Sequence, residues 1–542
     1  MNALIDHRLR RSWTSEAADA ARLPARAAKW LEQRIGQTAP GAAPAGDLPV
    51  EIPSPKLDES AAAALSEVVG AENVLVDDVA RLARATGLSY LDLLRRRSPT
   101  ADFPVPDAVV LPADPDEVQA VLDVCVKHDV GVVPFGGGTS VVGGVAALRG
   151  DKASVIALDL VRLDALVSVD AESRLAVLQA GVRGPEAERL LGEHGLTLGH
   201  IPQSFERATI GGFAATRSAG QASSGYGRFE DMVKGVRLAT PRGEWKLGVA
   251  PASAAGPDLR QLAVGSEGTL GVITEVSLRV RPAPPVKRYE GYALPSWDAG
   301  REAVRDLAQN HALADVTRLS DGDETEVSLA LNAGLKTAAL RKYLAARGVA
   351  RPCFLIVGWE GTAHDVALRR RETTRRLKAS GAVRVGKALG ESWRHGRFAG
   401  PRQRDVLMDQ GICVETLETA AYWSTVDELR DDVRAAITAS LGRSIVMCHI
   451  SHAYETGASL YFTVLTARDE ADPVGQWQRA KAAACEAITG LGTISHHHAV
   501  GVDHAPYLKA EIGSLGVEVL RAAKSAVDPT GILNPGKLVQ GR

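Results

Sequence analysis

Three glycine-rich clusters, each next to a predicted strand, constrain the fold of this chain more than any other feature of its sequence. The first cluster, PFGGGTSVVGG at residues 134–144, directly follows the apolar run GVV. Consecutive glycines after a strand allow several backbone N–H groups to converge on one anion, as a diphosphate requires. The alternative is a tight turn without a ligand, because the cluster lacks the lysine of a Walker loop and the GxGxxG pattern of a dinucleotide fold.

The two later clusters favour a flat polar ligand. Residues 202–231 read PQSFERATIGGFAATRSAGQASSGYGRFED, in which small residues alternate with hydroxyl and amide side chains. Such a stretch would pack poorly as a core, but its backbone N–H and C=O groups can lie close along a polar ring system. The third cluster, GSEGTLG at residues 265–271, precedes the clear strand pattern VITEVSLRV.

The residues before the first cluster predict a β-α-β unit. DAVVLP is a short apolar strand, and a helix follows it with Asp114 as N-cap, Pro115 at its first position and Glu117 closing a capping box. The apolar residues at 118, 121, 122 and 125 have helical spacing, so they predict one buried face. Beyond the prolines at 282–285, predicted helices such as residues 296–313 alternate with strands such as residues 354–359, which indicates a second α+β domain.

Composition excludes several classes of protein. With 542 residues, 45% of them hydrophobic, and a net charge of −2, the chain can bury large cores and lacks the positive charge that nucleic-acid binding needs. The five cysteines form no CxxC pair, which argues against a disulfide scaffold and a cysteine-zinc site. The sequence has neither an apolar run of about 18 residues nor the apolar stretch of a secretory signal, so we expect a cytoplasmic protein. Acidic residues among the first 35 favour an amphipathic helix over a transit peptide.

Together the three clusters resemble the FAD-binding domain of the PCMH-type flavoproteins, the vanillyl-alcohol oxidase superfamily, over about Phe103 to Pro282. The resemblance implies that the first cluster wraps the FAD diphosphate, the second lies along the ribityl chain and isoalloxazine, and the third holds the adenine side. It assigns these residues to FAD: Pro134, Phe135, Gly136, Gly137, Gly138, Thr139, Ser140, Val141, Pro202, Gln203, Ser204, Thr209, Gly211, Gly212, Thr216, Arg217, Ser218, Ala219, Glu267, Gly268, Thr269, Leu270, Gly271, Val272 and Ile273. Since the first cluster contains no histidine, we expect FAD to be bound non-covalently.

Motifs from Pro53 to the C-terminal half resemble the alkyldihydroxyacetonephosphate synthase family. They include ARLARATGLSYLDLLRRR, HIPQSFERATIGGFAATRSAG, VTRLSD, RDVLMDQG, ETLETAAYW, YETGASLYF, SHHHAVGVD and DPTGILNPGKL. This resemblance implies a flavin-dependent exchange, in ether-lipid synthesis, of the acyl chain of acyl-dihydroxyacetone phosphate for a fatty alcohol without net oxidation. It also implies a homodimer, and we expect contact with the membrane surface from which lipid is collected.

The expected fold class is α+β: a PCMH-type FAD-binding domain of two α/β subdomains, an α+β substrate-binding cap domain and an N-terminal helical segment. The expected boundaries are residues 1–103 for the N-terminal arm and helical segment, 104–283 for the FAD-binding domain, 284–480 for the cap domain and 481–542 for a segment returning to the flavin site.

Two arginines and a tyrosine are candidates for the substrate site. Arg318 and Arg404 are suited to the substrate phosphate because guanidinium groups bind phosphate through two hydrogen bonds, with a structural ion pair as the alternative for each. Tyr461 lies in the alternating pattern SLYFTVL and is either a core residue or, by the family resemblance, the catalytic tyrosine. In the catalytic case we expect neighbouring cations to lower its pKa.

Three consecutive histidines, His496, His497 and His498, are the candidates for proton transfer, because imidazole titrates near neutral pH. If they lie on a strand, His496 and His498 share one face and His497 points away. His449 and His452 are candidates for a metal site together with them, but we expect no metal.

Two other functions compete with the synthase. An FAD-linked dehydrogenase or oxidase of a 2-hydroxy acid uses the same fold, but such enzymes carry GHxGDGNxH where this chain reads CHISHAYETGASLYF. A flavin-binding protein without catalysis would not need the set formed by Arg404, Tyr461 and the three histidines. Both comparisons favour the synthase.

Overall fold

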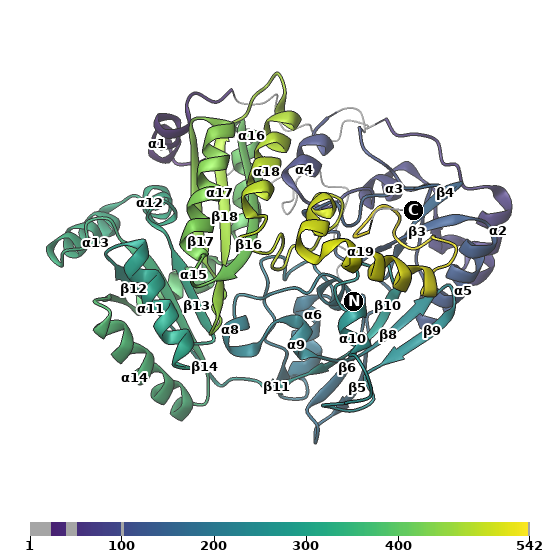
Figure 1. Ribbon diagram of the computed structural model, residues 1–542, viewed down its shortest axis with the longest axis horizontal. Helices are drawn as coiled ribbons and strands as arrows, with labels where there is room; N and C mark the ends of the chain where they lie inside the picture. The colour runs from purple at the N-terminus through teal and green to yellow at the C-terminus, as the bar shows by residue number, and fades with distance from the viewer. Residues whose placement is uncertain (1–22, 40–50, 99–101, 540–542) are drawn as a thin grey trace.

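The computed structural model describes residues 23–39, 51–98 and 102–539, which form two lobes lying side by side (Figure 1). The first lobe comprises residues 51–283 and the second lobe residues 284–488, with helix α1 (Ala25–Ile35) packed on the second lobe. Helix α4 (Tyr90–Arg96) belongs to the first segment of sequence but also buries residues in the core of the second lobe. The chain then runs back onto the first lobe (Figure 1). Residues 1–22, 40–50 and 99–101 of the expected N-terminal arm lie outside the described residues.

Two sheets build the first lobe. One has the strand order β1-β2-β4-β3, in which β4 pairs in parallel with both β2 and β3. The other is antiparallel with the order β5-β6-β10-β8-β9, and β7 pairs with β11 beside it. The strands are β1 Val74–Leu75, β2 Ala108–Val110, β3 Val130–Phe135, β4 Ser154–Asp159, β5 Leu166–Asp170, β6 Leu175–Gln179, β7 Leu196–Thr197, β8 Val233–Thr240, β9 Gly243–Leu247, β10 Val272–Arg279 and β11 Arg281–Pro282. The first glycine cluster thus starts at the end of β3 and the third precedes β10.

Most helices of the first lobe are short. They are α2 Glu59–Val69, α3 Asp78–Ala83, α4 Tyr90–Arg96, α5 Pro115–Lys127, α6 Gly184–Gly192, α7 Ile210–Ala215, α8 Ser223–Tyr226, α9 Phe229–Met232 and α10 Leu259–Ala263, with the 3-10 turn η1 Ala71–Asn73. Helices α7, α8 and α9 all arise within the second cluster, so that cluster folds as a series of tight turns and not as one long helix.

Helix α5 forms where the sequence predicts it, and its four predicted apolar positions are all buried. The carboxylate of Asp114 caps it by accepting hydrogen bonds of 2.9 Å from the amides of Asp116 and Glu117. The predicted capping box is wrong, because the Glu117 carboxylate accepts instead from the amide of Ala113 (2.6 Å), one residue before the N-cap. The Glu117 side chain therefore extends past the N-cap residue and contacts the last residue of the preceding loop.

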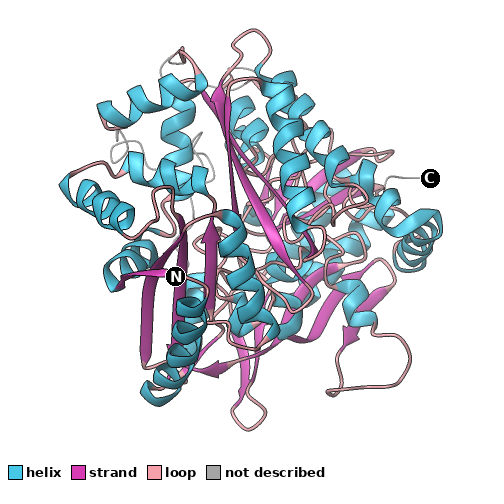
Figure 2. Ribbon diagram, turned by 60° about the vertical axis from the view of Figure 1, so that its left-hand side comes forward, coloured by secondary structure: helices cyan, strands magenta, loops and turns pink. Residues whose placement is uncertain are grey.

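The second lobe is built on a seven-stranded antiparallel sheet with the order β15-β12-β14-β13-β17-β18-β16. Its strands are β12 Val286–Leu294, β13 Val316–Ser320, β14 Cys353–Gly361, β15 Val383–Gly386, β16 Ile412–Tyr422, β17 Ser444–Ile450 and β18 Gly457–Ala467. Helices flank these long strands (Figure 2). They are α11 Trp297–Gln309, α12 Gly322–Leu331, α13 Leu335–Ala346, α14 Ala363–Ala379, α15 Lys387–Gly396, α16 Gly400–Asp409, α17 Val426–Leu441 and α18 Pro473–Ile488.

Three apolar clusters lie against this sheet. Helices α11, α14, α17 and α18 bury residues in the largest, α1, α12 and α16 contribute to a second, and α12 and α13 contribute to a third. The predicted amphipathic N-terminal helix is represented by α1, whose Ala27, Leu31 and Ile35 are buried. The α+β fold class is confirmed. Helix α18 continues across the expected boundary between residues 480 and 481, so the second lobe extends to Ile488.

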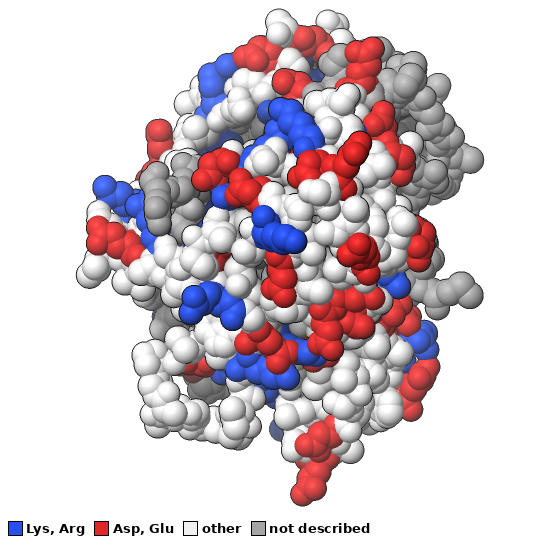
Figure 3. Space-filling view, turned by 90° about the vertical axis from the view of Figure 1, so that its right-hand side faces the viewer, with Lys and Arg blue, Asp and Glu red and all other residues white. Residues whose placement is uncertain are grey.

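The last described segment completes the first lobe. It contains the 3-10 turn η2 (Ala505–Tyr507) and helix α19 (Leu508–Val527), which lies on the front of the first lobe (Figure 1). The amide of Val132 in β3 donates to the carbonyl oxygen of Ile532, and the amide of Asn534 donates to that of Val132, both at 2.8 Å. No described helix is long and apolar enough to cross a bilayer. Basic and acidic side chains are interspersed over the face shown in Figure 3.

Candidate active site

The three glycine-rich clusters come together in space. A Cβ added at Gly137 in the first cluster would overlap the carbonyl group of Arg207 in the second, so that contact requires glycine. Gly268 in the third cluster has φ of +76° and lies against the ring of Pro134 at the start of the first. The predicted FAD residues therefore belong to one site, although they are spread over about 140 residues of sequence.

The combined site offers groups that FAD can satisfy. Within the described ranges, the backbone amides of residues 136–141 donate no hydrogen bond to another residue. Gln221 Oε1, Ser224 Oγ and Ser266 Oγ are buried and lack a hydrogen-bond partner in the described structure. Buried polar groups are normally paired, so these atoms indicate a polar ligand. The amides suit a diphosphate and the side-chain oxygens suit the polar atoms of the ribityl chain and ring system.

Some predicted FAD residues use their side chains to hold the loops. The Arg217 guanidinium donates to carbonyl oxygens within residues 261–264, and the Glu267 carboxylate accepts the amides of residues 500 and 501 at 2.9 and 2.8 Å. The other predicted FAD residues lie in the same three loops, in α7 and at the ends of β3 and β10. Glu267 therefore connects the third cluster to the returning chain.

Two residues that the sequence analysis did not single out contact the glycine-rich clusters from the C-terminal side. The side-chain amide of Asn534 donates to the carbonyl oxygens of Glu267 (2.6 Å) and Gly144 (3.2 Å). The ammonium group of Lys537 donates to the carbonyl oxygen of Ala146 (2.7 Å). Burial lowers the pKa of Lys537 to about 7 and raises the pKa of Glu267 to about 7. Both residues belong to the sequence motif NPGKL, and Asn534 in this motif donates hydrogen bonds to the first and the third cluster.

The histidine segment lies directly against the second cluster. The guanidinium group of Arg228 donates to the carbonyl oxygen of His496 (2.7 Å) and to that of Arg217 (3.1 Å). Glu230 pairs with Arg228 at 2.6 Å. One arginine thus joins the candidate proton-transfer groups to the loop predicted to lie along the flavin ring.

A row of polar side chains crosses the seven-stranded sheet at this place. Tyr461 on β18 is the cross-strand partner of Glu418 on β16 and of His449 on β17. Directly paired residues of neighbouring strands point to the same face. The ring of His449 stacks on that of Tyr461 with centroids 4.9 Å apart. Antiparallel pairing therefore places three residues from distant parts of the sequence on one surface.

Glu418, which the sequence analysis did not single out, shapes the histidine segment. Its buried carboxylate accepts hydrogen bonds from the backbone amides of His496 (2.7 Å), His497 (3.1 Å) and His498 (2.8 Å) and from the hydroxyl group of Ser495 (2.8 Å). The condition of a strand is not met: residues 495–498 form a turn around this carboxylate, so the predicted alternation of faces does not apply. Although burial alone would raise it, the neighbouring histidines, and His497 above all, hold the pKa of Glu418 well below its ordinary value of 4.5.

The turn directs the imidazole rings toward one another. His496 Nε2 lies 2.6 Å from the hydroxyl group of Tyr454, and His496 Nδ1 lies 2.9 Å from His497 Nδ1. His452 stacks on His496 with centroids 5.0 Å apart. Burial lowers the pKa values of His452 and His496 well below 6.5 and that of His498 to about 3. These three rings are therefore neutral at neutral pH, and burial makes them weaker bases than imidazole in water.

Tyr461 lies at the centre of the rings but is not acidified. Its ring stacks on His497 (centroids 5.9 Å apart) and meets His498 edge-on (5.6 Å). Burial raises its pKa to about 12, which contradicts the predicted lowering by neighbouring cations. Arg404 lowers the pKa by less than burial raises it. The phenol therefore carries its proton at neutral pH and acts as a hydrogen-bond donor.

The two predicted phosphate-binding arginines have different environments. Arg318 pairs with Glu324 and lies 3.1 Å from His449 Nδ1, so a carboxylate already balances its charge. Arg404 donates to the carbonyl oxygen of Leu88 (2.8 Å) and lies 3.6 Å from the carboxylate of Glu415, while its Nε is buried without a hydrogen-bond partner in the described structure. Both arginines therefore have a carboxylate neighbour, so the alternative of a structural ion pair stays open for each of them.

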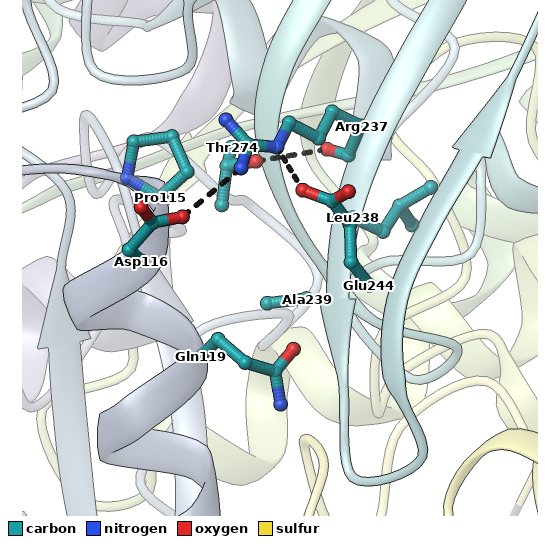
Figure 4. A pocket seen from close by; sticks show the side chains of 8 residues that line it. All are labelled: Pro115, Asp116, Gln119, Arg237, Leu238, Ala239, Glu244 and Thr274. Carbon is teal, nitrogen blue, oxygen red and sulfur yellow. Dashed lines mark hydrogen bonds and ion pairs between the residues drawn. The ribbon is translucent and has the colours of Figure 1, made fainter.

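A separate cavity of about 300 Å³ lies between α5 and strands β8–β10 of the first lobe (Figure 4). Its central guanidinium, that of Arg237, pairs with Asp116 (3.1 Å), Glu275 (3.4 Å) and Glu244. Figure 4 shows Asp116 reaching the guanidinium from α5. None of the predicted site residues lines this cavity, and its charged groups are paired with one another.

Comparison with known proteins identifies the family. Residues 106–247 match the family model described as FAD binding domain, and residues 283–538 match the C-terminal domain of FAD linked oxidases. The alkyldihydroxyacetonephosphate synthase of Trypanosoma brucei brucei is 32% identical over 505 residues, which are 90% of this chain and 82% of that relative. The chain belongs to the alkyldihydroxyacetonephosphate synthase family. FAD is accordingly its cofactor, in agreement with the groups that the three clusters present.

Further comparisons agree with membership of the synthase family. The alkyldihydroxyacetonephosphate synthase of Dictyostelium discoideum is 32% identical over 477 residues, 85% of this chain and 78% of that relative. A solved structure of an alkyldihydroxyacetonephosphate synthase superposes with a TM-score of 0.82 at 27% identity, covering 94% of this chain and 92% of the other. Substrate-bound p-cresol methylhydroxylase, with a TM-score of 0.69 at 16% identity over 90% of this chain and 98% of the other, shares the fold.

Proposed function

We propose that this protein exchanges the acyl chain of acyl-dihydroxyacetone phosphate for a fatty alcohol in a flavin-dependent step of ether-lipid synthesis. The observation that carries the proposal is the contact through Arg228 between the histidine turn and the second flavin cluster. It brings proton-transfer groups next to the predicted flavin ring. The relatives named as alkyldihydroxyacetonephosphate synthases support the choice of substrate.

The proposed exchange is balanced without an external oxidant or reductant. The C1–O bond to the acyl group breaks, a C1–O bond to the alcohol oxygen forms, and the hydroxyl proton of the alcohol leaves with the released fatty acid. Bound FAD supplies an electrophilic ring system that activates the substrate carbon. The protein has to bind the phosphate, move a proton to and from C1 and keep water away from the reacting carbon.

The described residues suit these tasks. We assign the transfer of the C1 proton to the histidine turn, because Arg228 connects this turn to the second cluster, next to the predicted flavin ring. The protonated phenol of Tyr461 is placed to donate a hydrogen bond to a substrate oxygen. Arg404, with its unpaired Nε, is the better candidate for the substrate phosphate, and Arg318 orients His449.

The deciding experiment is anaerobic and uses purified holoprotein. Acyl-dihydroxyacetone phosphate and labelled fatty alcohol are added while flavin absorbance and labelled ether product are followed, and a panel of 2-hydroxy acids is tested separately. We expect labelled ether without lasting flavin reduction. Bleaching of the flavin by a hydroxy acid with no ether formed would instead identify a dehydrogenase.

Three substitutions test the assignment of residues. We expect His497→Ala, Tyr461→Phe and Arg404→Ala each to abolish exchange while FAD stays bound, because none of these residues lies in the three flavin clusters. Loss of flavin from all three variants would contradict this division of roles. The ratio of flavin absorbance to protein absorbance provides the measurement.

We also propose non-covalent FAD, a homodimer, a cytoplasmic location and contact with the membrane surface. The absence of histidine from the first cluster supports non-covalent binding, so denaturation in acid should release all flavin into the supernatant. Light scattering of the purified protein measures the oligomeric state. Sedimentation with phospholipid vesicles measures membrane contact.

A further inference from the structure

Three histidines form a cluster whose spacing is suited to binding a metal ion. Ring nitrogens of His452, His496 and His497 all lie within 4.8 Å of one another. His452 and His496 are buried and His497 is nearly so. We propose that these three imidazoles bind one late first-row transition-metal ion such as Zn²⁺. This departs from the expectation of a site without metal, and it selects His452 and not His449 as the partner of the turn.

The first two ligands are already close to the required spacing. His496 Nδ1 and His497 Nδ1 are 2.9 Å apart, a separation that metal–nitrogen bonds of about 2.1 Å close with an angle of roughly 90° at the ion. The ion would take the place of the proton that the two rings share. The hydroxyl group of Tyr454 holds His496 Nε2, so the other nitrogen of that ring is the one directed at the ion.

The third ligand is available without breaking a hydrogen bond. His452 Nδ1 is buried and has no hydrogen-bond partner in the described structure, although only 3% of the residue is exposed. A buried ring nitrogen without a partner is costly, and a metal ion satisfies it. The stacking of His452 on His496 and its edge contact with His497 fix the ring beside the other two.

The charges around the cluster favour a cation. Glu418 Oε2 lies 3.3 Å from His497 Nδ1, the nitrogen assigned to the ion, so a buried carboxylate places its negative charge beside the proposed metal position. Arg228 is the nearby positive charge, and Glu230 pairs with it. A site made of imidazole nitrogens selects Zn²⁺, Co²⁺ or Cu²⁺ over Mg²⁺ or Ca²⁺, which prefer oxygen ligands.

Occupation by a metal would regulate the enzyme. A metal ion on His496 and His497 uses the lone pairs that proton transfer needs, so Zn²⁺ would stop the exchange while FAD stays bound. This consequence rests on the proposed function. The binding itself does not, because the cluster consists of this chain's own side chains and requires no substrate.

Equilibrium dialysis of untagged holoprotein against Zn²⁺, without substrate, tests the binding, with zinc counted by atomic emission. We expect one zinc per chain, its loss in His452→Ala and in His497→Gln, and its retention in His449→Ala, which removes a neighbouring buried histidine outside the cluster. Flavin absorbance and circular dichroism verify that each variant is folded. Because two different cluster residues are replaced, the test still works if one of the two variants fails to fold.

Less than one zinc bound by the wild-type protein, or one zinc retained by the folded His452→Ala variant, would overturn the inference. Because no substrate is present, a failure of the exchange assay leaves the zinc result intact. Conversely, an active synthase that binds no zinc would remove this inference and leave the proposed function in place.

Discussion

Replacing Glu418 by glutamine should destabilise the histidine turn without removing FAD. Glu418 Oε1 accepts three of the four hydrogen bonds from the turn, so the new amide nitrogen would occupy the position of Oε2 and face the His496 amide. Losing a hydrogen bond to a charged group costs about 1.5–3 kcal/mol, and the stranded buried amide costs a further 1–3 kcal/mol or so. We expect Glu418→Gln to lose about 3–5 kcal/mol of stability together with the exchange activity.

The dependence on pH gives this prediction a second, independent readout. The pKa of Glu418 in the folded protein is below its ordinary value of 4.5, so its contribution is complete above that pH and declines as the pH falls. Glutamine does not titrate. The gap in melting temperature between wild type and Glu418→Gln should therefore be largest near neutral pH and shrink below about pH 4.5.

The control is Glu360→Gln, which changes another buried carboxylate of the second lobe. Glu360 accepts the hydroxyl groups of Tyr226 (2.9 Å) and Tyr289 (2.7 Å) and makes no contact with the histidine turn. We expect it to lower the melting temperature and to keep the exchange rate per bound FAD. A Glu418→Gln protein with wild-type melting temperature and exchange rate would refute the reasoning.

Three further predictions test other parts of the structure. Gly137→Ala should give colourless protein, because its Cβ would overlap the second cluster; normal flavin content would contradict this. Asn534→Ala should weaken FAD binding about tenfold, measured by flavin fluorescence on dilution, since two hydrogen bonds between clusters are lost; unchanged affinity would argue against a closing role. Glu290, paired with three partly exposed arginines, has its pKa lowered to about 2 despite burial, so Glu290→Gln should cost about 1–2 kcal/mol after solvent screening. That difference should be complete above pH 4.5 and vanish as the pH falls through about 2; urea unfolding at several pH values measures it, and equal stability at pH 7 would contradict it.

The sequence predicted those features that local spacing determines. Helix α5 and the strands beside it follow from apolar periodicity, and the flavin clusters follow from glycines where backbone must approach backbone closely. The family resemblance extended this to the cofactor. The helix, the strands and the glycine-rich clusters each depend on residues that lie close together in the sequence, and the cofactor follows from the order of the three clusters along the chain.

The parts that sequence reasoning missed depend on long-range burial. Glu418 is about 80 residues away from the amides that it accepts, and nothing in its strand shows that a turn will wrap around it. The same holds for Tyr461, whose pKa was predicted from the sign of neighbouring charges but is set by the loss of water around the ring. Desolvation is a property of the assembled lobes, so only the structure could reveal it.

The return of the chain to the first lobe has a consequence for biosynthesis. Gly144 in the first cluster and Asn534, which closes it, are 390 positions apart, so a ribosome has to make the whole second lobe between them. A nascent chain that stops within that lobe lacks the residues that join the outer clusters. We therefore expect flavin loading to occur late, after the second lobe is made, so that the yellow colour of a preparation reports chains translated beyond that point.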